Sequence, residues 1–174
     1  MKTPLSNPVP WATGVRQVCV VVEDLDATIR AYWETAGIGP WAVWVPPLTD
    51  MRIHDVETPY SMKLALAWTE GFMWEVVQPL EGPSIYREFL DTRGEGMHHM
   101  LVETANHDYD EMIAEARRKG CPPLMQGNWA GTDFAYLDTE GPLRMILEIF
   151  RRPDGFRRPE PDYVYPTPPK DMPV

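Results

Sequence analysis

Four polar side chains stand inside short apolar runs of this chain, and together they have the chemistry of a metal site. They are two carboxylates, an amide and an imidazole: Glu75, Glu148, Gln17 and His99. A buried glutamate needs a cation, a proton or a hydrogen-bond donor to offset its desolvation. One divalent metal would serve both carboxylates at once. A metal that holds a carbonyl oxygen also acidifies the neighbouring carbon, which suits isomerase, epimerase or lyase chemistry.

An internal repeat would bring these side chains together. Gln17 precedes Asp26 by nine positions, and His99 precedes Asp108 by nine positions. In both halves a short apolar strand leads into an amphipathic helix that begins at an acidic residue. The two glutamates stand near the end of each half. The repeat therefore predicts two βαβββ units in which the glutamine matches the histidine and the glutamates match each other.

The expected architecture is an α+β fold, in which two tandem βαβββ modules form a cupped mixed sheet around the metal site. We expect one domain over residues 1–152, with module one at 13–80, a linker helix at 83–94 and module two at 96–152. Residues 48–60 show no clear period, and we interpret them as a loop.

The tail, residues 153–174, is rich in proline, with Phe156, Tyr163 and Tyr165 among the prolines. Proline excludes a regular helix or a central strand. We therefore expect the tail to wrap in an extended form across a surface, such as that of the partner in a homodimer.

Composition limits the partners. The formal charge of −10 argues against nucleic acid or an anionic membrane as a partner. No apolar run approaches the roughly 18 residues that span a bilayer, and the polar start Met1–Asn7 predicts no signal peptide. Two cysteines form no disulfide framework, which favours a cytoplasmic location. We expect a small-molecule carbonyl compound as the ligand.

Two stretches of the sequence carry a family resemblance. They are Trp74–Leu80 and Arg93–Met100, which resemble the vicinal oxygen chelate (glyoxalase/bleomycin resistance/dioxygenase) superfamily. The resemblance is closest to the methylmalonyl-CoA epimerase-like branch, which ends its first module with Pro-Leu and opens its second with Gly-x-His-His. It implies paired βαβββ modules around one divalent metal. The metal positions of the family fall on Gln17, Glu75, His99 and Glu148.

The ligand types depart from the epimerase pattern at two positions. Gln17 stands where that branch has a histidine, and Glu75 stands where it has a glutamine. As a set, the four residues match the ligand types of glyoxalase I. Three oxygen donors and one imidazole suit Zn, Ni, Co, Mn or Mg. An iron site for oxygen activation would need a second histidine at position 17.

The resemblance to glyoxalase I implies Glu148 as the catalytic base, with Glu75 as the other candidate. In epimerases the base is a separate glutamate on the third strand of module one, and the alignment places Lys63 near that point, so the base stays open. Each of these residues also has a structural interpretation, as a hydrogen-bonded strand histidine or a salt-bridged glutamate. Strict strand alternation predicts that His99 faces the cup and that His98 faces the helices.

Further residues are candidates for contact with the substrate. Cys19 would share the face of Gln17 as a small lining residue, and His54 and Tyr60 lie in a loop that could close over the site. Arg144 should share a face with Glu148 and would pair with a substrate carboxylate or with that glutamate. Tryptophans near strands or loops would rim the cup and favour a bulky or apolar substrate. These are Trp41, Trp44, Trp68 and Trp129.

The preferred function is a divalent-metal-dependent isomerase, epimerase or lyase that abstracts a proton next to a carbonyl through an enediolate-like intermediate. The first alternative is a non-catalytic protein of the same fold that binds a metabolite or a drug. The second is an extradiol-type dioxygenase, which the ligand types disfavour.

Overall fold

The computed structural model describes residues 11–104 and 108–167. The polar start Met1–Asn7 and the last seven tail residues lie outside this range. The elements, in chain order, are β1 (Ala12–Val21), α1 (Leu25–Ala36), β2 (Trp41–Trp44), β3 (Thr49–Ile53), β4 (Val56–Glu57), β5 (Met62–Thr69), β6 (Phe72–Pro79), α2 (Ile85–Arg93), β7 (Gly96–Thr104), α3 (Tyr109–Arg118), β8 (Pro123–Trp129), β9 (Thr132–Leu137), α4 (Glu140–Leu143), β10 (Ile146–Arg151) and β11 (Tyr163–Tyr165).

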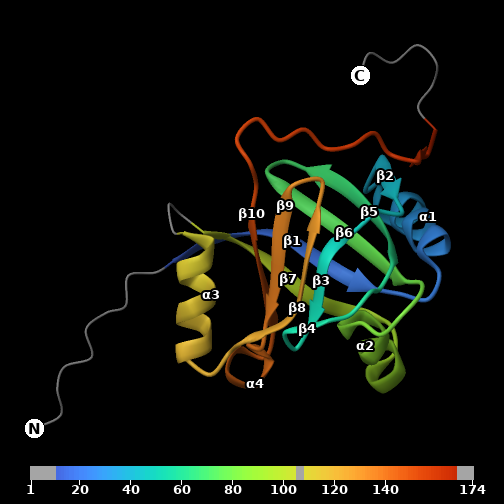
Figure 1. The fold of residues 1–174 in the computed structure, drawn as a ribbon. Helices are drawn as coiled ribbons and strands as arrows, with labels where there is room; N and C mark the ends of the chain where they lie inside the picture. Colours follow the sequence, from blue (N-terminus) through green and yellow to red (C-terminus); the bar gives the residue numbers. More distant parts are fainter. Residues whose placement is uncertain (1–10, 105–107, 168–174) are drawn as a thin grey trace, which may run out of the picture.

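The strands form one mixed sheet in the order β11-β2-β5-β6-β1-β7-β10-β9-β8-β3-β4. At its centre β1 and β7 pair antiparallel, and each has a parallel partner on its outer side, β6 for β1 and β10 for β7. Outward from the centre, β5 and β2 in the first half correspond to β9 and β8 in the second. The sheet curls into an open cup (Figure 1). The topology agrees with the α+β fold of repeated βαβββ units predicted from the sequence.

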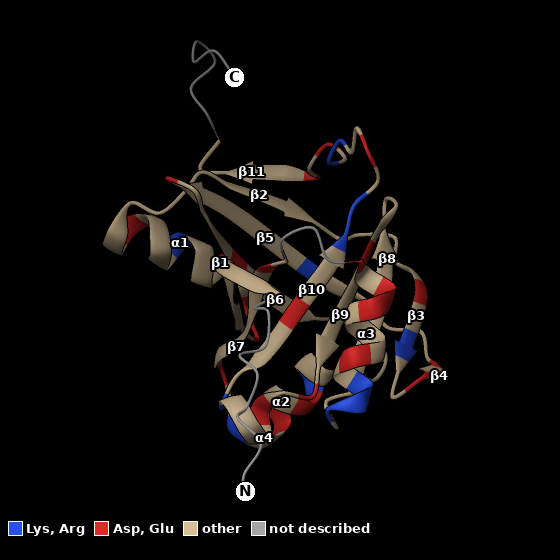
Figure 2. Cartoon of the chain, turned by 90° about the vertical axis from the view of Figure 1, so that its left-hand side faces the viewer, with Lys and Arg blue, Asp and Glu red and all other residues tan. Residues whose placement is uncertain are grey.

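Two helices cover the outer side of the sheet, one in each half. α1 begins at Asp24, whose side chain accepts from the Ala27 amide, and it buries Leu25 and Ile29 against β5 and β6. α3 begins at Asp108 in the same way and packs on β8 and β10. Its first turn is acidic and its last turn is basic, as the helix dipole favours (Figure 2). The helices leave the inner side of the cup free for the site.

The region predicted to be a loop contains two strands. β3 pairs with β8 of the second half, and β4 pairs with β3. The expectation of a loop over residues 48–60 was wrong, because β3 is short and mostly exposed, and only Met51 and Ile53 are half-buried against the core. Such a strand shows no alternation in the sequence.

The tail packs on its own chain. β11 extends the sheet by pairing with β2, and the hydroxyl of Tyr163 binds Asp26 at the start of α1. The Trp44 Nε1 donates to the carbonyls of Pro159 and Glu160 at 3.0 and 3.1 Å. The segment between β10 and β11 therefore runs over the mouth of the cup (Figure 1). The homodimer stays a prediction.

Candidate functional site

Gln17, Glu75, His99 and Glu148 come from the four central strands and meet on the inner side of the cup. The Gln17 Nε2 donates to the Glu75 Oε2 over 2.6 Å. The His99 Nε2 lies 3.1 Å from the same oxygen and 3.3 Å from the Glu148 Oε2. β1 and β7 place Cys19 opposite His99, and β1 and β6 place it opposite Glu75. The structure therefore brings together the four residues predicted as ligands; their role stays a prediction.

Burial sets the charges in this cluster. His99 is fully buried, which alone would lower the pKa of its imidazole, but the hydrogen bond with Glu75 and the charges of Glu148 and Glu75 raise it to about 9. Burial raises the pKa of the Glu148 carboxyl, and Glu75 adds to this effect while His99 opposes it. The metal-free site therefore holds a proton between an imidazole and two carboxylates.

His98 contributes directly to the cluster. Its Nδ1 lies 2.9 Å from the Nδ1 of His99, although strand alternation predicted opposite faces. The register of β1 against β7 skips His98, pairing Cys19 with His99 and Val20 with Met97, so this is a β-bulge. The bulge turns both rings inward, and His98 packs edge-on against Phe89 of α2. His98 therefore contacts helix α2, as predicted, but it also contacts His99, which strand alternation did not predict.

The His98 contact fixes the orientation of the His99 ring. Burial lowers the pKa of His98 to about 2, and the charge of His99 lowers it further, so His98 is neutral. His99 can donate from Nδ1 to His98, which directs its Nε2 toward Glu75 and Glu148. The protonated ring donates from Nε2 to Glu75, and the neutral ring would offer the lone pair of Nε2 to a metal. This partner on the far side of the ring is the usual way to orient a metal-binding histidine.

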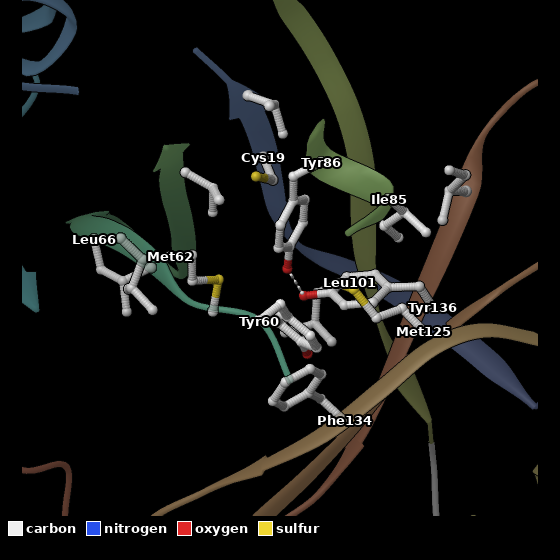
Figure 3. Packing of buried hydrophobic residues seen from close by; sticks show 14 of the residues in the cluster. Cys19, Tyr60, Met62, Leu66, Ile85, Tyr86, Leu101, Met125, Phe134 and Tyr136 are labelled. Atoms are coloured by element: carbon white, nitrogen blue, oxygen red, sulfur yellow. Dashed lines mark hydrogen bonds between the residues drawn. The ribbon is translucent and has the colours of Figure 1, made fainter. Parts of the chain in front are cut away.

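Aromatic side chains form the floor of the cup. The Tyr86 hydroxyl donates to the Tyr136 hydroxyl over 2.6 Å (Figure 3). The centroid of the Tyr136 ring lies 4.7 Å from that of the His99 ring. Burial raises the pKa of both phenols, so they stay neutral. Burial also raises the pKa of the Cys19 thiol, which is fully buried in the core beneath the cluster and is not among the residues that line the cavity.

An inner cavity of about 60 Å³ opens onto the cluster. Its polar wall consists of Gln17, Glu75 and Glu148. Its other walls are mostly apolar and come from both halves of the sheet and from the tail: Met62, Leu64, Leu66, Met73, Leu101, Trp129, Thr132, Phe134, Tyr136, Phe150, Arg152, Phe156 and Arg158. The cavity thus places a small polar patch inside an apolar pocket, as small-molecule sites do.

The residues fit a divalent metal ion. The Glu148 Oε2 is buried and, among the described residues, makes no hydrogen bond; its 3.3 Å approach to His99 is a charge contact only. The ligand atoms of Cys19, Glu75 and His99 lie within 4.8 Å of one another. A half-turn of the Gln17 amide would present its oxygen to the same point. Carboxylate, amide and imidazole donors suit ions from Mg to Zn.

Other predicted contact residues lie away from the cluster. Lys63 is on the outer face of β5 and pairs with Asp26 at 2.6 Å. His54 is exposed in the turn between β3 and β4. Tyr60 is in the core, and its hydroxyl donates to the Gln126 carbonyl over a long 3.4 Å. Trp68 lines a second pocket at the mouth of the cup.

The prediction for Arg144 was wrong. The sequence indicated that Arg144 shares a strand face with Glu148, which requires a strand that already includes residue 144. In the structure α4 occupies residues 140–143, and Arg144 ends it in the left-handed region at φ 61° with an exposed side chain. β10 starts only at Ile146. Arg144 is therefore outside the cup.

The tail residues of the cavity were not predicted. Phe156 and Arg158 line the cavity together with Arg152 at the end of β10. The signal was present as aromatic and basic residues in the segment 152–158, but a chain segment without a period has no predictable direction.

In the described part of the chain, no helix is long and apolar enough to cross a membrane.

The sequence and the fold were compared with those of known proteins. The family model of the glyoxalase/bleomycin resistance protein/dioxygenase superfamily matches residues 16–136. No curated protein sequence matches significantly. Methylmalonyl-CoA epimerase from Mycobacterium tuberculosis is similar in structure, with a TM-score of 0.59 and 21% identity over 86% of this chain and 94% of that one.

Two further structures are similar. A methylmalonyl-CoA epimerase variant from Streptomyces coelicolor, in complex with 2-nitronate-propionyl-CoA, has a TM-score of 0.53 and 21% identity over 81% of this chain and 98% of that one. A hypothetical protein from Bacillus halodurans has a TM-score of 0.58 and 16% identity over 83% and 97% of the two chains. At these identities the likeness shows the fold.

Proposed function

Because the chain belongs to the glyoxalase/bleomycin resistance protein/dioxygenase superfamily, we propose that it is a divalent-metal-dependent enzyme that abstracts a proton from a carbon next to a carbonyl group. The reaction would be an isomerisation, an epimerisation or a lyase step. The observation that carries the proposal is the buried cluster of Gln17, Glu75, His99 and Glu148, in which one carboxylate oxygen has no hydrogen-bond partner.

The four cluster residues would hold the metal, which when bound would polarise the substrate carbonyl and stabilise the negative charge that develops as the proton leaves. Glu75 is tied to Gln17 and His99, so it suits a fixed position. Glu148 has an Oε2 without a hydrogen bond, and burial raises the pKa of its carboxyl. Glu148 is therefore the better candidate for the base, because a raised pKa lets a carboxylate keep the proton it takes.

The walls of the cavity complete the site. Met62, Leu66 and Phe134 present apolar surface next to the carboxylates. Apolar walls exclude water, which strengthens electrostatic contacts inside the cup and protects a carbanion from uncontrolled protonation. The same walls favour a substrate with an apolar body.

Hydrogen–deuterium exchange tests the proposal. The metal-loaded protein is incubated in deuterium oxide with 2-substituted acyl thioesters, 2-oxoaldehyde adducts and cyclic hydroxy-ketones, and carbon-bound deuterium is measured by mass spectrometry. We expect exchange with at least one class. Glu148→Gln should slow it by about 10²- to 10⁴-fold, the usual contribution of a general base. Glu34→Gln, on the exposed side of α1, is the matched control.

Three outcomes decide between the functions. Exchange that survives in Glu148→Gln would move the base to another residue. No exchange in any class, together with tight ligand binding after chelation of the metal, would favour the non-catalytic binding protein. Oxygen uptake with iron and a catechol would favour the dioxygenase.

A further inference from the structure

A second pocket lies at the mouth of the cup and is lined by three arginines. Its volume is about 330 Å³, and Arg16, Arg152 and Arg158 are the only charged residues among its lining in the described chain. It adjoins the inner cavity, with which it shares Met73, Leu101, Phe150, Arg152 and Arg158. Three arginines therefore line the pocket that adjoins the cavity at the carboxylate cluster.

Two of these arginines have no carboxylate partner. In the range 11–104 and 108–167, neither Arg152 nor Arg158 forms an ion pair. Other arginines without an ion pair, such as Arg30, Arg52 and Arg144, line neither of the two cavities. Arg151, next to Arg152, pairs with both Asp110 and Asp133. The chain has 26 acidic and 16 basic residues, so acidic partners are plentiful. Two unpaired guanidinium groups at one pocket of an acidic protein indicate that an anion from outside the chain pairs with them.

Aromatic rings hold both guanidinium groups in place. The Arg158 Cζ lies 5.2, 5.7 and 5.8 Å from the ring centroids of Trp68, Trp44 and Trp129. The Arg152 Cζ lies 4.3 Å from the Phe150 centroid and 5.2 Å from that of Phe156. Contact with aromatic rings restricts the motion of a guanidinium, and a guanidinium can bind a planar, two-oxygen acceptor through its N–H groups. The rings thus prepare both groups for a carboxylate.

The backbone next to Arg158 is also fixed. The carbonyls of Pro159 and Glu160 accept from Trp44, and the Asp162 carboxylate accepts from the Val45 amide at 2.8 Å. The same tryptophan therefore anchors the tail and contacts the Arg158 guanidinium. Burial lowers the pKa of Arg158 to about 10, with the charge of Arg152 adding to the effect and the charge of Glu75 opposing it, and a bound anion would oppose it further.

We propose that Arg158 and Arg152 form the anion-binding end of the substrate site, and that the substrate is a compact, apolar carboxylic acid. Its carboxylate would lie between the two guanidinium groups, its apolar body against Met73 and Phe150, and its reacting carbon beside Glu148. The two adjoining cavities, of about 60 and 330 Å³, fit a small molecule. The position of the reacting carbon beside Glu148 rests on the proposed function. The binding of the carboxylate by the two arginines does not.

Binding to the metal-free, full-length protein tests the anion site without turnover. The probes are benzoate, 3-phenylpropionate and hexanoate, each compared with its primary amide, and binding is followed by calorimetry and by tryptophan fluorescence. We expect at least one acid to bind roughly tenfold or more tightly than its amide, the scale of a charge-assisted hydrogen bond. Arg158→Gln and Arg152→Gln should each remove most of this preference. Arg157→Gln, exposed on the same segment, should keep it.

Several results would overturn the proposal. They are equal binding of acids and amides, no saturable binding of any acid to the wild-type protein, or an acid preference that survives in Arg158→Gln. Coenzyme A serves as a phosphate-bearing probe: if it binds more tightly than every acid and loses its affinity in Arg158→Gln, the anion is a phosphate and the carboxylate assignment is wrong. This binding experiment uses no metal and no reaction. Its outcome therefore does not depend on whether the proton-exchange experiment succeeds or fails.

Discussion

The His99 imidazole carries a proton at neutral pH in the metal-free protein, and a metal must displace it. Its folded pKa of about 9 lies above the ordinary value of 6.5. Protonated His99 therefore stabilises the metal-free fold fully below about pH 6.5, and this contribution declines as the pH rises through about 9. Metal binding needs the neutral ring, so metal affinity should rise as the pH rises.

We predict that the apparent Zn affinity rises by up to about tenfold per pH unit between pH 6 and 8. The raised pKa of Glu148 acts in the same direction. Competition with a chromophoric chelator at several pH values measures this slope. His54→Gln changes an exposed histidine and should keep the slope, whereas His99→Gln should lose both affinity and slope. An affinity that does not depend on pH would contradict the proton assignment.

His98 is a positioning residue in this scheme, because it touches His99 and not the metal. We predict that His98→Phe lowers Zn affinity by roughly 10- to 100-fold, the usual effect of losing a partner of a ligand histidine. His98→Gln keeps an acceptor and should recover part of the affinity. Thermal unfolding of the metal-free variants shows whether the fold is preserved. Equal affinities of both variants and the wild type would leave His98 with a packing role only.

At the scale of elements, the pairing of β8 with β9 shapes one wall of the cavity. Gly127 on β8 lies opposite Phe134 on β9, and a Cβ at Gly127 would come within 2.6 Å of the Phe134 ring. Phe134 lines the inner cavity. We therefore predict that Gly127→Ala lowers the free energy of unfolding by about 1–3 kcal/mol, the usual cost of overpacking. Urea denaturation measures it.

Gly141 offers the matched control for this substitution. A Cβ at Gly141 meets no atom within 4 Å, and the residue lies in the short helix α4. Gly141→Ala should be neutral or slightly stabilising, because alanine restricts the unfolded chain without a clash. If both variants lose the same stability, close packing of Phe134 on Gly127 is not the cause.

The elements differ in how well the sequence predicts them. Amphipathic helices and buried strands were predictable, because burial of one face leaves a period in the sequence. The strand β3 was missed because it is short and mostly exposed, and the bulge at His98 was missed because alternation assumes a regular ladder. Arg144 was misplaced because Gly141 and Pro142 form a short helix in the connection, not a strand.

At the scale of the whole molecule, the site depends on the repeat. The repeat placed Gln17 and His99 on the paired central strands β1 and β7, and the two glutamates on β6 and β10 beside them. A symmetric topology forces such positions to meet, so the cluster was predictable from spacing. The tail lies outside the repeat, and nothing in its sequence period indicated that Arg158 would return to the cup.

A metal that joins four strands from both halves should stabilise the whole fold. Gln17 and Glu75 come from the first half, and His99 and Glu148 from the second. We predict that Zn or Ni at about 100 times its dissociation constant raises the free energy of unfolding by about 2.7 kcal/mol. Thermal unfolding with metal, and again after chelation, measures the shift.

Matched glutamate variants decide whether this stabilisation comes from the cluster. Glu148→Gln removes one carboxylate and should lose most of the metal-dependent shift at the same metal concentration, because a weaker site is less saturated. Glu34→Gln removes an exposed carboxylate of α1 and should keep the full shift. If the wild-type unfolding curve is the same with and without excess metal, the cluster is a hydrogen-bonded network that needs no ion. The anion site at Arg158 would then remain testable, since its binding experiment uses metal-free protein.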